Sequence, residues 1–520
     1  MKDNEKILKQ INTTSFIVLF LFIISIIFID HWIYACVDDD AYYYFTIARN
    51  LSSGEGITYC NEPTNGFQPL WLFILSGINY LIGNSQWLVK IGFILGSLFF
   101  LLSTIWVYKS ARIVFKQKGL SLFTSFIWLT NYFLLIKSGE GLETGLYLLI
   151  LSIFLFIWLR RIYFNDKTKL KDWIILGIIS GLGFLARIDI CFILLVIWIA
   201  SLIKEIRQEK SLIKGSVKIG IGFSIYLVFS LPWVIYNINL WHNPLPVSAY
   251  FASESFYSPS TFLKRLYFSL IGLFQMPIYY PINFFIWRLK GFKKIAGIFI
   301  LIVLLWGIYL ARKDKEILNS QEKINFYIIM LISSLIFYTA YLTAKIAYWF
   351  LPRYLAPVIF LMIFINAELW YKILSPKRIY VIIFCSIILI GCLWMRMYSI
   401  LERIDNSERY LRIYRMQNLE WITKNIPKSI ILAGFQSGIY NYYLSEKGYI
   451  FYNLDGKVSI NAYKALKEKR LMNYIKEKRI KYIIDWKIYF DALKKEYKLK
   501  DNEIRLIEKL NGDYLVEVIY

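Results

Sequence analysis

A series of long apolar runs constrains the fold of this 520-residue chain more than any other feature of its sequence. Each run is roughly 17–25 residues long, the length that a helix needs to cross the hydrocarbon core of a bilayer. Short stretches rich in Lys and Arg separate the runs, and 58% of all residues are hydrophobic. A soluble chain of this size has far fewer apolar residues. The sequence therefore predicts an α-helical multi-pass membrane protein.

We expect about 11 membrane-spanning helices. They are predicted near Ser15–Tyr34, Ile91–Tyr108, Leu120–Ile136, Thr144–Leu159, Trp173–Ala186, Ile190–Ile203, Ile219–Leu240, Ile295–Leu310, Phe326–Thr343, Leu355–Leu369 and Ile379–Met395. Two further apolar segments are predicted not to cross. Gln68–Ile82 is short and no basic loop follows it, so we expect an amphipathic helix along the outer membrane face. Leu266–Trp287 contains two prolines, and a crossing there would invert the charge pattern of all later loops. We expect an interfacial or re-entrant segment at that position.

The basic residues account for a formal net charge of +24 and follow a regular pattern. They precede the first predicted span and follow the second, fourth, sixth, eighth and tenth. The positive-inside rule places these connections in the cytoplasm, together with the N-terminus. The connections between them then face outwards. Because this pattern explains the charge, we exclude nucleic acid as a partner and expect membrane lipid instead.

The polar tail differs from the rest of the chain, because it alternates helix and strand patterns. We predict helices at 416–427 and 462–479, and strands at 429–435, 448–454, 481–485 and 513–520. Such alternation is typical of a small α/β domain. We therefore divide the chain into a transmembrane part, 1–397, whose first outer loop is 35–90, and an extracytoplasmic α/β domain, 398–520.

Three adjacent carboxylates, Asp38, Asp39 and Asp40, lie at the outer end of the first predicted span. A carboxylate facing a polar cavity can act as a general base or hold a divalent cation such as Mg²⁺ or Mn²⁺. A solvated loop that marks the end of the span explains the charges equally well. Asp40 is the preferred base, because a helix is predicted to begin there and a capping Asp is held rigidly. Asp39 is the second candidate.

Other candidate substrate-binding residues lie in outward connections far apart in the sequence. They are Asn65 in NEPTNGFQPLW, Glu143 in SGEGLET, Arg187 and Asp189 in LARID, and Arg353 and Tyr354 in WFLPRYLAP. Arg353 in its aromatic setting suits a phosphate, although an arginine reaching the membrane interface is also common. A local Arg187–Asp189 ion pair is the simpler explanation for those two residues. A transporter would place its ionisable groups near mid-membrane, so their position on one side favours chemistry at the outer interface.

Cysteine and histidine provide few further candidates. His31 and His242 are the only histidines, too few for a metal site built mainly of histidine ligands. Cys36 and Cys60 flank the acidic stretch, where either a disulfide or two free thiols is compatible with the sequence.

Several motifs together resemble the GT-C superfamily of integral-membrane glycosyltransferases, and within it a group of prokaryotic proteins. They are DDA at 39–41, ARN at 48–50, glycines at 54 and 56, PTNGFQPLW at 63–71, the G-ET turn at 141–144, LPVS at 245–248, PRYLAP at 352–357 and NLDG at 453–456. The resemblance extends over nearly the whole chain. One departure is the run AYFASESF after LPVS, where a basic residue is expected. Arg353 is the candidate to replace it.

The resemblance implies an inverting transfer of a sugar from a polyprenyl-phosphate donor to a glycan, lipid or protein on the outer face of a prokaryotic cytoplasmic membrane. A first-loop Asp is the implied base and an arginine the implied phosphate ligand, while the outer domain would bind acceptor. Two alternatives remain open at this stage. One is a flippase or transporter of lipid-linked glycans, and the other is a polymerase or ligase of surface polysaccharide that uses a lipid diphosphate donor.

Overall fold

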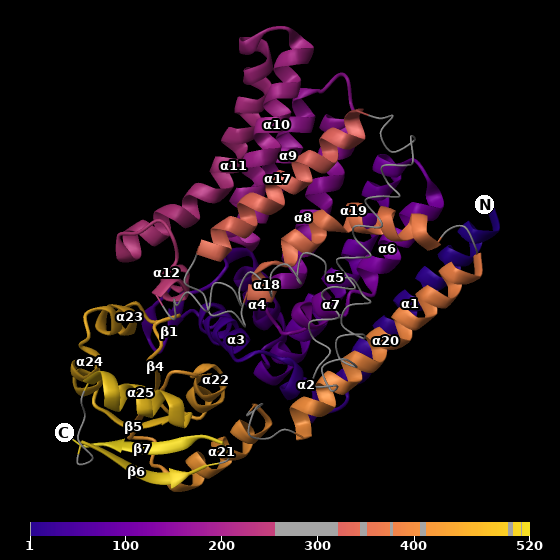
Figure 1. The fold of residues 1–520 in the computed structure, drawn as a ribbon. Coiled ribbons are helices and arrows are strands. Elements are labelled where there is room, and N and C mark those ends of the chain that lie inside the picture. The colour runs from indigo at the N-terminus through magenta and orange to yellow at the C-terminus, as the bar shows by residue number, and fades with distance from the viewer. Residues whose placement is uncertain are drawn as a thin grey trace.

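The computed structural model consists of a helical part followed by an α/β part that lies against it (Figure 1). The residues that it describes are 2–254, 321–343, 351–374, 378–405, 412–497, 503–510 and 512–519. The helical part contains α1 (Lys2–Ile27), α2 (Asp30–Cys36), α3 (Asp39–Ser52), α4 (Pro69–Ile82), α5 (Ser85–Phe115), α6 (Lys118–Leu129), α7 (Tyr132–Ser138), α8 (Thr144–Trp158), η1 (Leu159–Tyr163), α9 (Leu170–Ala186), η2 (Ile188–Ile190), α10 (Cys191–Glu209), α11 (Leu212–Trp241), α12 (Val247–Glu254), α17 (Gln321–Thr343), α18 (Leu351–Tyr354), α19 (Ala356–Leu374) and α20 (Arg378–Asp405).

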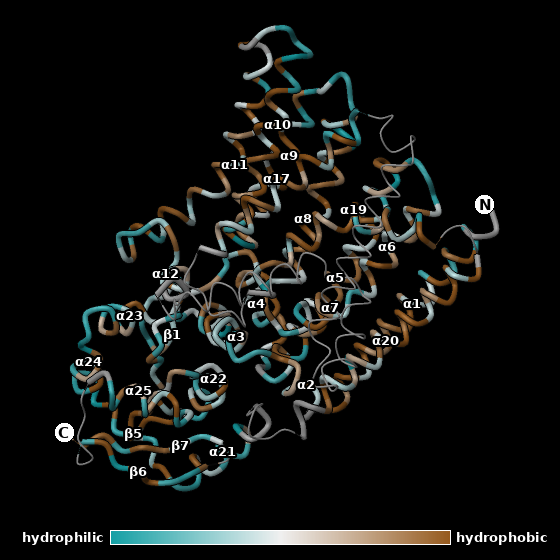
Figure 2. The backbone as a smooth tube through the Cα atoms, viewed as in Figure 1, coloured by the Kyte–Doolittle hydropathy of each residue, from teal (hydrophilic) through white to brown (hydrophobic). Residues whose placement is uncertain are grey.

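Seven of the described helices are long and apolar enough to cross a membrane, and the bent pair α6–α7 adds an eighth if it is one span. Figure 2 shows hydrophobic residues along these helices and hydrophilic residues at many of their ends. The prediction of a multi-pass helical membrane protein is confirmed. The fifth and sixth predicted spans correspond to α9 and α10, which pack against α11. These two helices are not among the seven that are long and apolar enough to cross.

Two predicted spans have a different form from the one expected. The first, Ser15–Tyr34, is interrupted near its C-terminal end, because α1 ends at Ile27 and α2 begins at Asp30. The third is broken between α6 and α7, which meet at an angle of 52°. The predicted segments 266–287 and 295–310 lie outside the described residues, so the total number of spans stays a prediction.

The short helix predicted at residues 68–82 is present as α4. Its 14 residues are too few to cross a bilayer. One side of it packs against α3 and α9, while Phe73, Tyr80 and Leu81 are exposed. A short helix with an exposed apolar face suits the membrane surface.

The α/β part contains a five-stranded sheet with the order β4-β3-β5-β7-β6. Its strands are β3 (Ile431–Gly434), β4 (Phe451–Asn453), β5 (Ile480–Asp485), β6 (Ile504–Lys509) and β7 (Tyr514–Val518). β3 runs parallel to both β4 and β5, whereas β7 is antiparallel to β5 and β6. Its helices are α21 (Arg412–Asn425), α22 (Gly438–Glu446), α23 (Ile460–Lys467), α24 (Leu471–Glu477) and α25 (Lys487–Tyr497). An α/β tail is therefore confirmed.

The secondary structure predicted for the tail differs from the structure in one helix, and three elements of the tail were not predicted. The single helix predicted at 462–479 is two helices, α23 and α24, because Lys469 between them takes a positive φ of 55° that ends the first one. β6, α22 and α25 were not predicted. Their apolar residues are too few or too irregular in spacing to give a clear period.

The α/β part does not have a hydrophobic core wholly of its own. Leu419 of α21, Ile439 of α22 and Phe451 of β4 belong to the same buried cluster as the membrane helices. A second cluster lies elsewhere in the α/β part and includes Ile475 and Ile483. The predicted boundary after residue 397 falls within α20, and independent folding of the tail stays a prediction.

Candidate active site

A cavity of about 400 Å³ lies where the first loop, several connections between the membrane helices and the α/β part meet. Its lining residues come from segments distant in the sequence: Asp40, Tyr43, Tyr44, Gly66, Phe67, Gln68, Leu142, Glu143, Arg187, Ile188, Asp189, Cys191, Phe192, Leu245, Pro246, Ser248, Ala249, Ala340, Tyr341, Arg353, Tyr354 and Lys457. Six of the eight predicted site residues are in this set. The other two, Asp39 and Asn65, are not.

Asp38 begins the helix that carries the acidic triplet. Its carboxylate accepts a hydrogen bond from the backbone N–H of Asp40 at 3.2 Å, and its extended backbone marks it as the N-cap of α3. The prediction that Asp40 caps this helix is therefore wrong by two residues. Asp40 lies in the first turn, and its side chain is available to the cavity.

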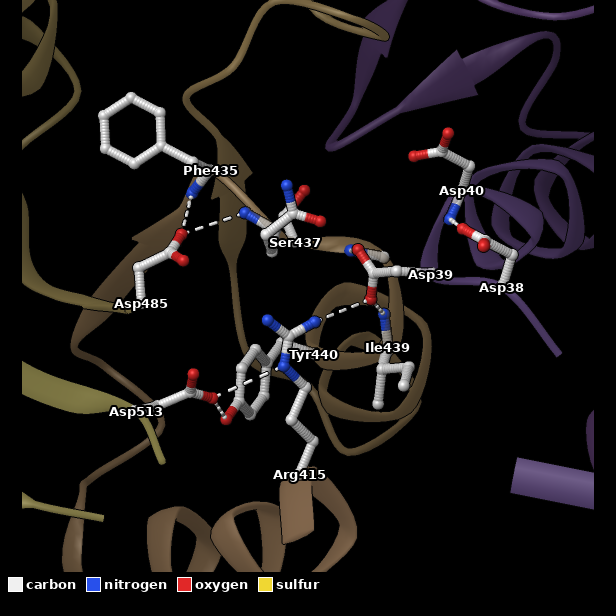
Figure 3. Close-up of polar contacts among 12 residues, drawn as sticks. Asp38, Asp39, Asp40, Arg415, Phe435, Ser437, Ile439, Tyr440, Asp485 and Asp513 are labelled. Carbon is white, nitrogen blue, oxygen red and sulfur yellow. Dashed lines mark hydrogen bonds and ion pairs between the residues drawn. The ribbon is translucent and has the colours of Figure 1, made fainter. Parts of the chain in front are cut away.

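Asp39 is buried and turned towards the α/β part (Figure 3). Its carboxylate accepts a hydrogen bond from Arg415 at 2.9 Å, and from the backbone N–H groups of Gly438 and Ile439 at 3.2 and 3.1 Å. The start of α22 thus receives the negative charge that a helix N-terminus favours. The sequence-based choice of Asp39 as a second base does not agree with this position, because the side chain joins two parts of the fold instead of lining the cavity.

Arg415 continues this contact into the α/β part. Its Nε lies 3.4 Å from the carboxylate of Asp513, which also accepts a hydrogen bond from Tyr440. Burial lowers the pKa of Arg415, but the charges of Asp513 and Asp39 raise it above its ordinary value. Asp485 lies nearby and accepts hydrogen bonds from two backbone N–H groups (Figure 3). Burial raises the pKa of Asp485 to about 7.

Asp40 faces two cations in the cavity. Its Oδ1 accepts a hydrogen bond from Lys457 Nζ at 3.0 Å, and its Oδ2 lies 3.8 Å from Arg353 Nη1. Lys457 also lies 3.5 Å from Asp455. Burial lowers the pKa of Lys457, but the charges of Asp40 and Asp455 raise it well above its ordinary value, so the lysine stays protonated. Burial raises the pKa of Asp455 to about 6.

A second polar group lines the cavity around Arg187. Its Nη2 donates to Asp189 at 2.6 Å, and its Nη1 lies 3.7 Å from Glu143. The local Arg187–Asp189 ion pair expected from the sequence is therefore present. Tyr44 donates a hydrogen bond to Glu143 at 3.1 Å, and Tyr341 donates to Asp189. This group offers hydroxyl and carboxylate oxygens to a polar ligand, while its charges are largely compensated within the protein.

Asn65 has a different role from the one predicted. It is completely buried and donates to Asn237 Oδ1 at 2.9 Å, while its own Oδ1 accepts from the backbone N–H of Val247 at 3.2 Å. These contacts join the first loop to the end of α11 and the start of α12. The Asn65 side chain therefore holds the first loop in place beside the cavity, and does not itself line the cavity.

The three adjacent acids do not form a converging set of metal ligands. Asp38 caps α3, Asp39 meets Arg415, and Asp40 points away from both towards the cavity (Figure 3). No cluster of three His, Cys, Asp or Glu side chains suited to a metal ion occurs among the described residues. A divalent cation at these acids stays a prediction that this arrangement does not favour. Neither Cys36 nor Cys60 forms a disulfide.

Lys457 was missed at the sequence level, although a signal for it was present. It follows the NLDG motif directly, and that motif is a tight turn after β4. The Asn453 side chain accepts a hydrogen bond from the backbone N–H of Gly456 at 2.9 Å, and Gly456 has a φ of +80°. Lys457 therefore lies in the cavity together with Arg353, the residue that the sequence suggested in place of the basic residue after LPVS. Tyr43, Tyr44 and Tyr341 were also missed, because tyrosines in apolar segments look like core residues.

A family model matches one part of the membrane region of this chain. Residues 62–236 match the family model described as dolichyl-phosphate-mannose-protein mannosyltransferase. This match covers less than half of the chain.

Among solved structures, the chain is similar to the crystal structure of ArnT from Cupriavidus metallidurans in the apo state. The TM-score is 0.56 at 13% identity, over 97% of this chain and 98% of that one. The apo oligosaccharyltransferase of Archaeoglobus fulgidus has a TM-score of 0.48 at 12% identity, over 93% of this chain and 71% of that one. No match to a curated protein sequence was found.

Proposed function

We propose that this protein transfers a sugar from a polyprenyl-phosphate donor to an acceptor hydroxyl, with inversion, at the outer face of a prokaryotic cytoplasmic membrane. The observation that carries the proposal is the position of Asp40, which lies in the 400 Å³ cavity with Arg353 and Lys457 beside it. A carboxylate next to cations in a cavity at the end of the spans suits a base that works beside an anionic leaving group.

In the proposed reaction, Asp40 takes the proton of the acceptor hydroxyl as its oxygen attacks the anomeric carbon. The bond between that carbon and the phosphate oxygen breaks, and polyprenyl phosphate leaves. Arg353 stabilises the charge that develops on the leaving phosphate. The sugar hydroxyls would exchange hydrogen bonds with three side chains that line the same cavity, Glu143, Asp189 and Tyr341. The acceptor is a glycan, lipid or protein.

The shared side of the first loop and the α/β part supports the proposed orientation. Asp39 contacts Arg415 and Gly438 directly, so the two regions lie at the same end of the membrane helices. Cysteines introduced at Ser53 and Lys467 in a background without the native cysteines should react with an impermeant reagent in intact cells. A cysteine at Asp166, in a basic connection, should react only after lysis. Labelling of Asp166 in intact cells, with Ser53 protected, would reverse the orientation.

A panel of donors tests the reaction itself. Membranes that contain the full chain or its Asp40→Asn variant are incubated with labelled polyprenyl-phosphate sugars and, separately, with a lipid diphosphate donor. We expect transfer from a monophosphate donor by the wild type, a loss of transfer in the variant, and an inverted anomeric centre in the product by NMR. Transfer from the diphosphate donor alone would favour the polymerase or ligase alternative. Movement of the donor across the vesicle membrane, without transfer of its sugar, would favour the flippase alternative.

A further inference from the structure

The cationic groups of the cavity are not equally available to an incoming phosphate. Arg187 already pairs with Asp189 at 2.6 Å and Glu143 at 3.7 Å. Arg353 lies 3.8 Å from Asp40, and Lys457 lies 3.0 Å from Asp40 and 3.5 Å from Asp455. Asp40 is thus a partner of both cations, and a base that takes up a proton during the reaction would release them. A phosphate that leaves water for a partly apolar cavity needs cationic partners to replace its hydration. The charge for this purpose therefore lies on Arg353 and Lys457.

Close packing against the first loop holds Lys457 in position. Thr64 donates a hydrogen bond to the carbonyl of Val458 at 2.6 Å. A Cβ at Gly66 would overlap the carbonyl oxygen of Lys457, so only glycine allows the two backbones to approach this closely. The Asp39–Arg415 ion pair adds a second attachment between α3 and the α/β part. The backbone of Lys457 is thus fixed, while its long side chain keeps the freedom to change partner.

We propose that Lys457 is a substrate-binding residue that exchanges partners: it pairs with Asp40 before donor binds, and moves to the donor phosphate afterwards. This inference rests on the proposed function and extends it to a residue of the α/β part. Asp40 has a cation at each carboxylate oxygen in the structure, so both oxygens already have a partner. Transfer of Lys457 to the phosphate would leave one oxygen free to accept a hydrogen bond from the acceptor hydroxyl. Donor binding would then prepare the base.

Equilibrium binding of radiolabelled polyprenyl monophosphate to the full chain in nanodiscs tests the exchange. Lys457→Met removes the charge, and we expect the affinity to fall about 10- to 100-fold, the usual worth of a charge-assisted hydrogen bond. Lys457→Arg should restore most of the affinity. Lys478→Met is the matched control, because this lysine pairs with Glu62 at the same interface but does not line the cavity. Polyprenol, which has no phosphate, should bind all variants alike.

A second variant predicts a change in the opposite direction. Asp40→Asn removes the competing anion, so it should bind polyprenyl monophosphate more tightly than the wild type does. Adding Lys457→Met should reduce that gain to the part that Arg353 alone provides. Unchanged phosphate binding by Lys457→Met, or an equal loss of polyprenol binding, would overturn the exchange and leave the proposed function intact. Failure of the wild type to bind polyprenyl monophosphate at all would overturn both.

Discussion

Removal of the charge of Asp39 separates a positioning role from a catalytic one. The side chains of Asp39 and Arg415 are 7% and 2% exposed, and they meet at 2.9 Å. Loss of one partner from such a buried pair typically costs about 3–5 kcal/mol, because the remaining charge stays buried without compensation. Asp39→Asn keeps an acceptor for the α22 N–H groups but loses the charge. We therefore expect it to weaken the attachment between α3 and the α/β part by nearly this amount.

Cys60 provides the assay, because it lies at the same interface. Its thiol donates to the carbonyl of Phe451 and accepts a hydrogen bond from Asn441 at 2.9 Å, both in the α/β part. Cys60 is partly exposed in the closed structure, and opening of this interface releases its thiol from both hydrogen bonds, so an increase in its labelling rate reports opening. In a background whose other cysteines are replaced, Asp39→Asn should raise this rate about 10²- to 10³-fold, since 1.4 kcal/mol corresponds to a factor of ten.

Two controls make this result specific. Lys478→Met breaks a partly exposed ion pair with Glu62 at the same interface and should raise the rate less than about fivefold, because such pairs contribute at most about 1 kcal/mol. Asp39→Asn combined with Arg415→Met removes both charges and should recover part of the loss. If Asp39→Asn left the labelling rate at the wild-type value and still abolished turnover, Asp39 would be a catalytic group and the reasoning from its contacts would fail.

Further predictions concern the site and the pH dependence. Asp40→Asn should lower kcat by about 10²- to 10⁴-fold with unchanged expression, whereas Asp38→Asn should stay active because Asn caps a helix as well as Asp does; equal turnover in both variants would contradict the assignment. Gly66→Ala should lower turnover by displacing the backbone of the nearby α/β turn, while Gly77→Ala, with open space around its Cβ, should not; steady-state kinetics compares the two. The pKa of Asp485 is about 7 in the folded state and about 3.9 in the unfolded state. The protonated side chain therefore contributes stability that is fully present below about pH 3.9 and is lost as the pH rises to about 7. Asp485→Asn should therefore flatten the pH dependence of the melting temperature between these values, and a slope equal to that of the wild type would refute the prediction.

The sequence by itself determined the class of fold and the general location of the site. Long apolar runs restrict the backbone to a helix, because each backbone N–H and C=O group buried in lipid needs a hydrogen-bond partner. A helix provides these partners within the same segment. The short length of the α4 segment and the alternating pattern of the tail were equally informative, since both follow from local periodicity. The grouping of Asp40, Glu143, Arg187, Asp189, Arg353 and Tyr354 around one cavity was anticipated for the same reason: topology places alternate connections on one side.

Only the tertiary structure decided which of three adjacent acids faces that cavity. Successive residues at a helix start point in directions about 100° apart, so Asp38, Asp39 and Asp40 meet three different environments. The partners that distinguish them, Arg415 and Lys457, lie more than 370 residues further along the chain. No local pattern carries that information. It arises when glycine at the interface allows the α/β part to pack against the first loop, and this packing gives each acid its own partner.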